Sequence, residues 1–447
     1  MTGKTGSKAD IWMIYSVQAA YFLKWPKSPL DSGRSNVSVV VAQGANMIDA
    51  RMGKPLTTGN SEAAEKYQLA VNRILGSEAG AAEMLDQALA LDGNLALALA
   101  ARYMLAKDAN SMDANLFKER ALLAAEAALP WERAHISALF ALLDDPYINL
   151  GATEAYVAAN PSDLLVISQL CGYLIFYGGA RKLERVLNIM ESVDPRLHDD
   201  WACLARLGFA ASEAGDRNRG RSLVERALQQ RPQALYVIHS YAHVLHDQGR
   251  PEESLDLLGD WLIEHRRSAE GGAMYGHVHW HLALAEWQLG LTEQAWQRYE
   301  RYCAPETTRC GPVLTLADCG GFLFREYLRT GTTRPVSPAV SELSDRFSSM
   351  LSHPFIALHL AGIQASAGDI AALEQGRAAI ATEESSDQTR LSLSLVDAVS
   401  QFARGKYAAA AETLKSLSAD QRISVGGSYV ERMLIDLVEA RAVELAA

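Results

Sequence analysis

Residues 201–234, WACLARLGFAASEAGDRNRGRSLVERALQQRPQA, decide the fold because they read as two helices joined by a turn at Gly215. A second glycine turn follows at Gly249, 34 residues later, which is the spacing of a repeated helical hairpin. Large apolar residues keep helical spacing on both sides of the turn, Gly208 lets the two helices approach, and Pro232 ends the unit. The chain is therefore expected to repeat pairs of helices.

The period matches tetratricopeptide repeats, most clearly over residues 201–234, 235–268 and 276–309, with looser repeats before and after. One such hairpin has apolar residues on more than one face and buries them only by stacking on its neighbours. We therefore expect an all-α fold over residues 49–445. It would be an α-solenoid of antiparallel helix-turn-helix (tetratricopeptide) repeats that forms a right-handed superhelix with a concave inner surface.

Residues 1–48 differ from the rest and are expected to form a poorly ordered or loosely packed leader. The apolar run 11–23 is shorter than the roughly 20 residues that cross a bilayer. Asp10 adjoins it, and no small-x-small cleavage site follows. We therefore predict neither secretion nor a membrane anchor. Whether residues 1–46 belong to the mature protein stays open.

Composition narrows the class of protein. Apolar residues make up 49% of the 447 residues and charged residues 21%, which is typical of a folded, soluble chain. The net charge of −11 argues against nucleic acid as a partner, because such binders carry a basic stripe. Five cysteines without a CxxC spacing favour reduced thiols in a cytoplasmic protein.

Several strings resemble the tetratricopeptide-repeat protein 38 family, and together they extend over roughly residues 49–445. In chain order these strings are Gly53-Lys54-Pro55-Leu56-Thr57-Thr58, Glu132-Arg133-Ala134-His135, Asn160-Pro161, Ala242-His243-Val244-Leu245, Trp280-His281-Leu282-Ala283-Leu284 and Gly426-Gly427-Ser428. The resemblance implies the repeat fold, with the first helix of each pair lining the concave surface. It implies no secure biochemical activity.

Histidines gather in the centre of the chain: seven of the eleven lie between His239 and His281. His239/His243 and His277/His281 are i,i+4 pairs, so each pair shares one face of its helix. In the family's register these faces point into the concave groove. Asp318, on the next expected helix (roughly 313–328), can accept a ring N–H and fix a tautomer.

Three kinds of site residue follow as candidates. The catalytic candidates are His239, His243, His281 and Asp318. The ligand-binding candidates are His246, His277, Arg133, His135, Trp280 and Tyr236. If a metal binds, its ligands would be His239, His243, His277 and His281, and the cofactor would be a divalent transition ion.

Several interpretations of the cluster stay open: structural packing, a metal site, metal-free acid–base catalysis or plain ligand binding. The chain carries no HExxH, GxSxG, P-loop or GxGxxG string. Our first hypothesis is a binding protein whose concave, histidine-rich groove holds a protein, peptide or small molecule. The alternative is an enzyme with hydrolase- or lyase-like acid–base or metal-assisted chemistry at the same residues. The repeat ends can be capped by a helix or by a second copy in a homo-oligomer.

Overall fold

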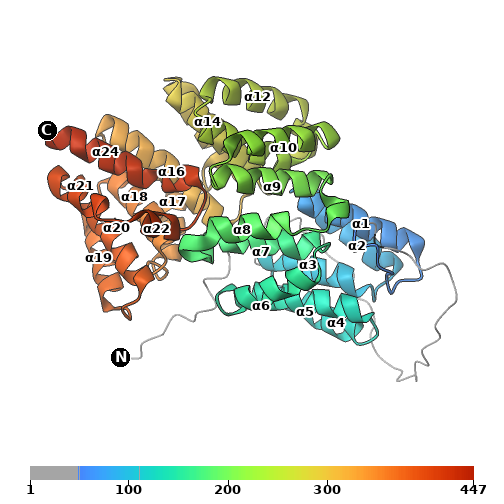
Figure 1. The fold of residues 1–447 in the computed structure, drawn as a ribbon. Coiled ribbons are helices and arrows are strands. Elements are labelled where there is room, and N and C mark those ends of the chain that lie inside the picture. Colours follow the sequence, from blue (N-terminus) through green and yellow to red (C-terminus); the bar gives the residue numbers. More distant parts are fainter. Residues whose placement is uncertain (1–48, 50, 110) are drawn as a thin grey trace.

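The computed structural model describes residues 49, 51–109 and 111–447, so the predicted leader over 1–48 lies outside the described residues. Within these ranges the chain is all-α: helices follow one another with short connections, and no β-strand is present. Figure 1 shows the helices packed side by side along the chain. None of the described helices is long and apolar enough to cross a lipid bilayer.

The first section consists of four successive helical pairs. Its helices are α1 (Ser61–Leu75), α2 (Ala81–Leu91), α3 (Ala96–Asp108), α4 (Ala114–Ala125), α5 (Pro130–Asp144), α6 (Pro146–Ala159), α7 (Leu164–Tyr177) and α8 (Lys182–Glu191), with 3-10 turns at Gly179–Arg181 and Pro195–Leu197. Side chains cap several starts: Asn60 accepts the N–H of Ala63, and Asp163 that of Val166.

The central section contains the ranges predicted to be the clearest repeats. Its helices are α9 (Trp201–Glu213), α10 (Arg217–Gln230), α11 (Leu235–Asp247), α12 (Pro251–Glu264), α13 (Arg266–Ala269), α14 (Tyr275–Gln288) and α15 (Thr292–Arg298), followed by a π-helical turn at Tyr299–Cys303. Gly215 and Gly249 make their turns with φ of 102° and 64°, a left-handed conformation that favours glycine. Gly208 lies so close to α10 that a Cβ there would meet Val224 Cγ1 at 2.7 Å.

The last section ends with a short stretch that returns to the centre of the molecule. Its helices are α16 (Pro312–Thr330), α17 (Pro338–Phe347), α18 (Pro354–Ala367), α19 (Ile370–Thr382), α20 (Asp387–Ala403), α21 (Tyr407–Lys415), α22 (Ala419–Ser424), α23 (Tyr429–Arg432) and α24 (Leu434–Ala446). The amide of Gly427 donates to the carbonyl of Ile175 in α7, and α23 packs on α11.

Three distant parts of the chain therefore surround α11 and α14. From the first section, the Gly76 carbonyl accepts the amide of Tyr236 at 2.9 Å. From the last section, α16 packs on α14 and α23 packs on α11. The largest apolar core runs through all three sections, from Leu56 to Val430. The predicted histidine pairs consequently lie inside the molecule.

Candidate metal centre and its cavity

The two predicted histidine pairs meet in one buried cluster. His239 and His243 project from α11, and His277 and His281 project from α14, one helical turn apart in each case. One ring nitrogen from each residue lies within 4.8 Å of those of the other three. The side chains are only 2–6% exposed. We call His239, His243, His277 and His281 the four-histidine cluster.

Hydrogen bonds fix two orientations in the four-histidine cluster. His277 Nδ1 lies 2.7 Å from Asp318 Oδ1 on α16, so its Nε2 is left for the other rings. His239 Nε2 and His243 Nε2 lie 2.9 Å apart, and two neutral imidazoles form a hydrogen bond at this distance when the tautomer of one ring places its proton on Nε2.

Four buried polar atoms at the cluster have no hydrogen-bond partner among the described residues. They are His239 Nδ1, His243 Nδ1, His281 Nε2 and Asp318 Oδ2. Buried polar atoms are nearly always paired, so each exception requires an explanation. An ion bound through the ring lone pair would account for His281 Nε2, whereas the unpaired Nδ1 atoms of His239 and His243 are not the atoms that meet in their 2.9 Å contact.

Burial keeps most of the cluster uncharged. It lowers the pKa of His239, His243 and His281 well below the usual value for histidine, and the neighbouring rings lower it further. Burial also acts to lower the pKa of His277, but the charge and hydrogen bond of Asp318 outweigh it and the net shift is upward. The rings of His239, His243 and His281 are therefore predominantly neutral at pH 7, and the neutral imidazole is the form that binds metal ions.

Trp280 holds Asp318 in place through a hydrogen bond to its backbone. The Asp318 backbone carbonyl accepts the indole N–H of Trp280 at 2.9 Å, and that indole stacks on His277 with an interplanar angle of 12°. Burial raises the pKa of the Asp318 carboxyl to about 6, although His277 opposes this rise. Trp280 is fully buried and does not line the cavity, so its predicted place in the wall of a binding pocket is wrong. It supports the ring of His277 instead.

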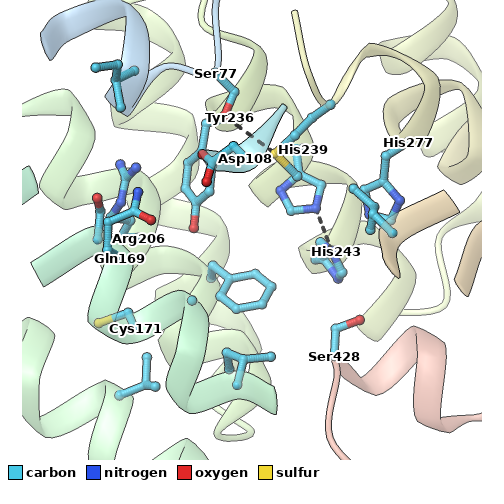
Figure 2. A pocket seen from close by; sticks show the side chains of 18 of the residues that line it. Ser77, Asp108, Gln169, Cys171, Arg206, Tyr236, His239, His243, His277 and Ser428 are labelled. Carbon is cyan, nitrogen blue, oxygen red and sulfur yellow. Dashed lines mark hydrogen bonds between the residues drawn. The ribbon is translucent and has the colours of Figure 1, made fainter. Parts of the chain in front are cut away.

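A cavity of about 110 Å³ adjoins the four-histidine cluster (Figure 2). His239, His243 and His277 line it, whereas His281 lies behind them. The remaining wall is largely apolar and comes from Ile74, Met104, Leu105, Cys171, Ile175, Val186, Met190, Phe209, Met274 and Leu314. We call this cavity the central cavity. An ion held by the four rings would therefore face the central cavity on one side.

Several polar residues that line the central cavity were not among the predicted site residues, whereas Tyr236 was. Asp108 comes from α3, Arg206 from α9 and Glu431 from α23. No motif marks them, because tertiary packing alone brings these helices to α11. Glu431 lies three residues after the string Gly426-Gly427-Ser428, and this string was the one sequence feature that pointed to its region.

Three predicted ligand-binding residues do not line the central cavity. His246 packs near Tyr429, with ring centroids 6.3 Å apart, although it is near enough to His243 and His281 to lower the pKa of both rings. Arg133 is exposed and donates to the carbonyl of Ala128. His135 is buried in a second cavity, where its Nδ1 lies 2.7 Å from Asp163 Oδ2. The structure therefore does not bring Arg133 and His135 to the four-histidine cluster.

Comparison with protein-family models gives no match for this chain, and comparison with curated proteins gives none either. The resemblance to the tetratricopeptide-repeat protein 38 family therefore rests on the sequence strings quoted above.

Proposed function

We propose that this protein binds one divalent transition-metal ion through the four-histidine cluster and uses it to bind and activate a small molecule in the central cavity. The observation that carries the proposal is the convergence of four imidazole nitrogens within 4.8 Å, from two neighbouring helices. Structural packing alone would leave His281 Nε2 buried without a partner among the described residues.

The donor set narrows the choice of ion. Neutral imidazoles suit zinc, copper, nickel, cobalt and iron, whereas magnesium and calcium prefer oxygen ligands. A tetrahedral ion with bonds of about 2.0–2.1 Å separates its nitrogen ligands by roughly 3.4 Å. The 2.9 Å contact between His239 and His243 would lengthen slightly, and the widest nitrogen separations would shorten.

Two buried carboxylates near the four-histidine cluster would help to neutralise the charge of a divalent ion. Asp318 hydrogen-bonds to His277, the arrangement that orients metal-binding histidines in many proteins. Glu431 is 3% exposed, and its charge acts on His277. Its Oε2 accepts the amide and hydroxyl of Ser428, both at 2.7 Å, while Oε1 has no partner among the described residues.

The enclosed position favours the enzyme alternative over peptide binding in an open groove. The four rings are at most 6% exposed, so a peptide could not reach them without displacing helices. Three of them face a cavity large enough only for a small molecule. A metal ion at that wall would polarise a carbonyl or lower the pKa of a bound water, which are the contributions that hydrolases and lyases use.

We further propose that the helical pairs form a tetratricopeptide superhelix of the type seen in the tetratricopeptide-repeat protein 38 family. Support comes from the 34-residue period and from the left-handed turns at Gly215 and Gly249. The pairs α9/α10, α11/α12 and α14/α15 occupy the three ranges that match the repeat best.

Metal analysis tests the proposed function. Protein purified without chelators or a histidine tag should contain about one transition ion per chain by mass spectrometry, and cobalt loading should produce visible absorption bands. Replacing both His243 and His281 by Asn should abolish both signals. The control His265→Asn changes a half-buried histidine outside the cluster and should retain them. If the wild-type protein holds no ion and binds none of zinc, cobalt, nickel, copper or iron, the proposal is wrong.

A further inference from the structure

The central cavity carries a buried cation on the side away from the histidines. In Figure 2, Arg206 and the histidines stand on opposite sides of the view, with Tyr236 between them. We propose that the central cavity binds a small carboxylate with a compact apolar body, whose carboxylate pairs with Arg206 and whose far end reaches the four-histidine cluster. This inference deepens the proposed function and rests on it for the role of the metal.

Arg206 lacks an acidic partner. It is 7% exposed, and its guanidinium donates to two backbone carbonyls, Ala202 at 3.1 Å and Leu75 at 3.0 Å. No carboxylate of the described residues forms an ion pair with it within 4.0 Å. By contrast, the half-buried Arg298 pairs with Glu286 at 2.6 Å. A buried charge without a counter-charge is costly, and a carboxylate ligand would neutralise it.

The guanidinium also has the geometry for this role. It lies over the ring of Tyr236, 4.1 Å from the ring centroid, which fixes its plane. Burial lowers its pKa, but an arginine side chain still carries its charge at neutral pH. Two of its five N–H donors serve the carbonyls, so others remain for an anion.

Asp108, an acidic residue that lines the cavity together with Arg206, does not strongly oppose the binding of an anion. Asp108 is buried, and burial raises the pKa of its carboxyl well above the usual value. Its charged form is therefore disfavoured, so Asp108 repels a carboxylate ligand less than an ordinary aspartate would. Glu431 also lines the cavity, but it comes from α23, which packs on the histidine-bearing helix α11.

The volume and lining limit the body of the ligand. A cavity of about 110 Å³ is somewhat smaller than the roughly 150 Å³ apolar cavity that holds one benzene molecule. Phe209, Met274 and Leu314 contribute apolar walls. The apolar body of the ligand must therefore be smaller than a benzene ring, so the class is a short branched carboxylate about the size of isobutyrate. A hydroxyl or carbonyl at its far end would face the metal.

Binding of isobutyrate to the full-length protein tests the inference. Isothermal titration calorimetry compares isobutyrate with isobutanol, which has the same carbon skeleton without the charge. We expect tighter binding of isobutyrate to the wild-type protein and a roughly tenfold to hundredfold loss in Arg206→Gln. Isobutanol affinity should change little. The control Arg217→Gln alters an exposed arginine on α10 and should leave isobutyrate binding intact.

The outcomes separate this inference from the metal proposal. Isobutyrate binding that depends on Arg206 in a protein without metal would support the carboxylate site and overturn only the metal. Normal metal content with equal affinity for isobutyrate and isobutanol would overturn the carboxylate site alone. If Arg206→Gln does not fold, the wild-type comparison of the two ligands still decides, and Arg206→Lys, which keeps the charge, should retain the preference for isobutyrate.

Discussion

Asp318 acts on the four-histidine cluster through a single contact, the 2.7 Å hydrogen bond from His277. Asp318→Asn keeps the size and one acceptor oxygen but removes the negative charge. Because such outer carboxylates raise the basicity of the ligating ring, we expect metal affinity to fall roughly tenfold to hundredfold. Competition with a chromophoric chelator measures this change.

Asp345→Asn is the matched control, since Asp345 is exposed on α17. It should bind metal as the wild-type protein does. Unchanged affinity in Asp318→Asn, with the protein folded by circular dichroism, would contradict the role given to this carboxylate.

The same residues show what sequence could predict about the site. The i,i+4 spacing of His239/His243 and His277/His281 follows from helix geometry, so their shared faces could be derived without a structure. Arg206 could not be found in this way. It is an ordinary polar residue in the first helix of the preceding pair, no motif marks it, and the packing of α9 beside α11 brings it to the cavity.

At the scale of elements, the contact between α9 and α10 depends on Gly208. A Cβ there would lie 2.7 Å from Val224 Cγ1 and 3.0 Å from the Gly220 carbonyl, so Gly208→Ala should force the helices apart. We expect a loss of about 1–3 kcal/mol in the free energy of unfolding. Urea denaturation followed by circular dichroism measures it.

Gly259 on α12 offers a matched comparison, because a Cβ there would meet nothing within 4 Å. Gly259→Ala should therefore stabilise the protein by roughly 0.5–1 kcal/mol, the gain expected for alanine over glycine inside a helix. Equal effects of the two substitutions would show that helix propensity, and not the close approach at Gly208, decides their sign.

The helical pairs show which parts of the fold can be predicted from local sequence patterns. Apolar periodicity and the glycine turns predict α9 to α12 as two helical pairs over 201–234 and 235–268, because both signals arise within one hairpin. The connection between α12 and α14 contains the short helix α13, and α15 runs into a π-helical turn. The repeat pattern predicted neither the short helix nor the π-helical turn.

At the scale of the molecule, the C-terminal section folds back onto the first two sections. Buried charged side chains hold it there. The Lys182 ammonium of α8 donates to the carbonyls of Ile175 and Gly427, and the Arg325 guanidinium of α16 donates to that of Val430. The Glu213 carboxylate of α9 accepts the amide of Tyr429. Sequence alone could not predict the contacts to Gly427, Val430 and Tyr429, because their partners lie 105 to 245 residues apart.

Glu213→Ala tests whether this packing of the C-terminal section holds the cavity together. It removes the acceptor of the Tyr429 amide and the ion-pair partner of Arg432, so the buried guanidinium keeps only its hydrogen bond to the Gly427 carbonyl. We expect a loss of about 3–5 kcal/mol in the free energy of unfolding. Residues 426–433 should also show faster amide hydrogen exchange, measured by mass spectrometry, because their local opening becomes easier.

The rate at which a bound ion is released tests whether the packing of α23 on the centre of the molecule matters for the proposed function. If α23 holds the cavity shut over the four-histidine cluster, Glu213→Ala should release a bound ion to a chelator faster than the wild-type protein does. Glu252→Ala, an exposed change on α12, should alter neither exchange nor release. Faster exchange at 426–433 with an unchanged release rate would mean that the ion leaves by another route. The C-terminal return would then stabilise the fold without gating the site.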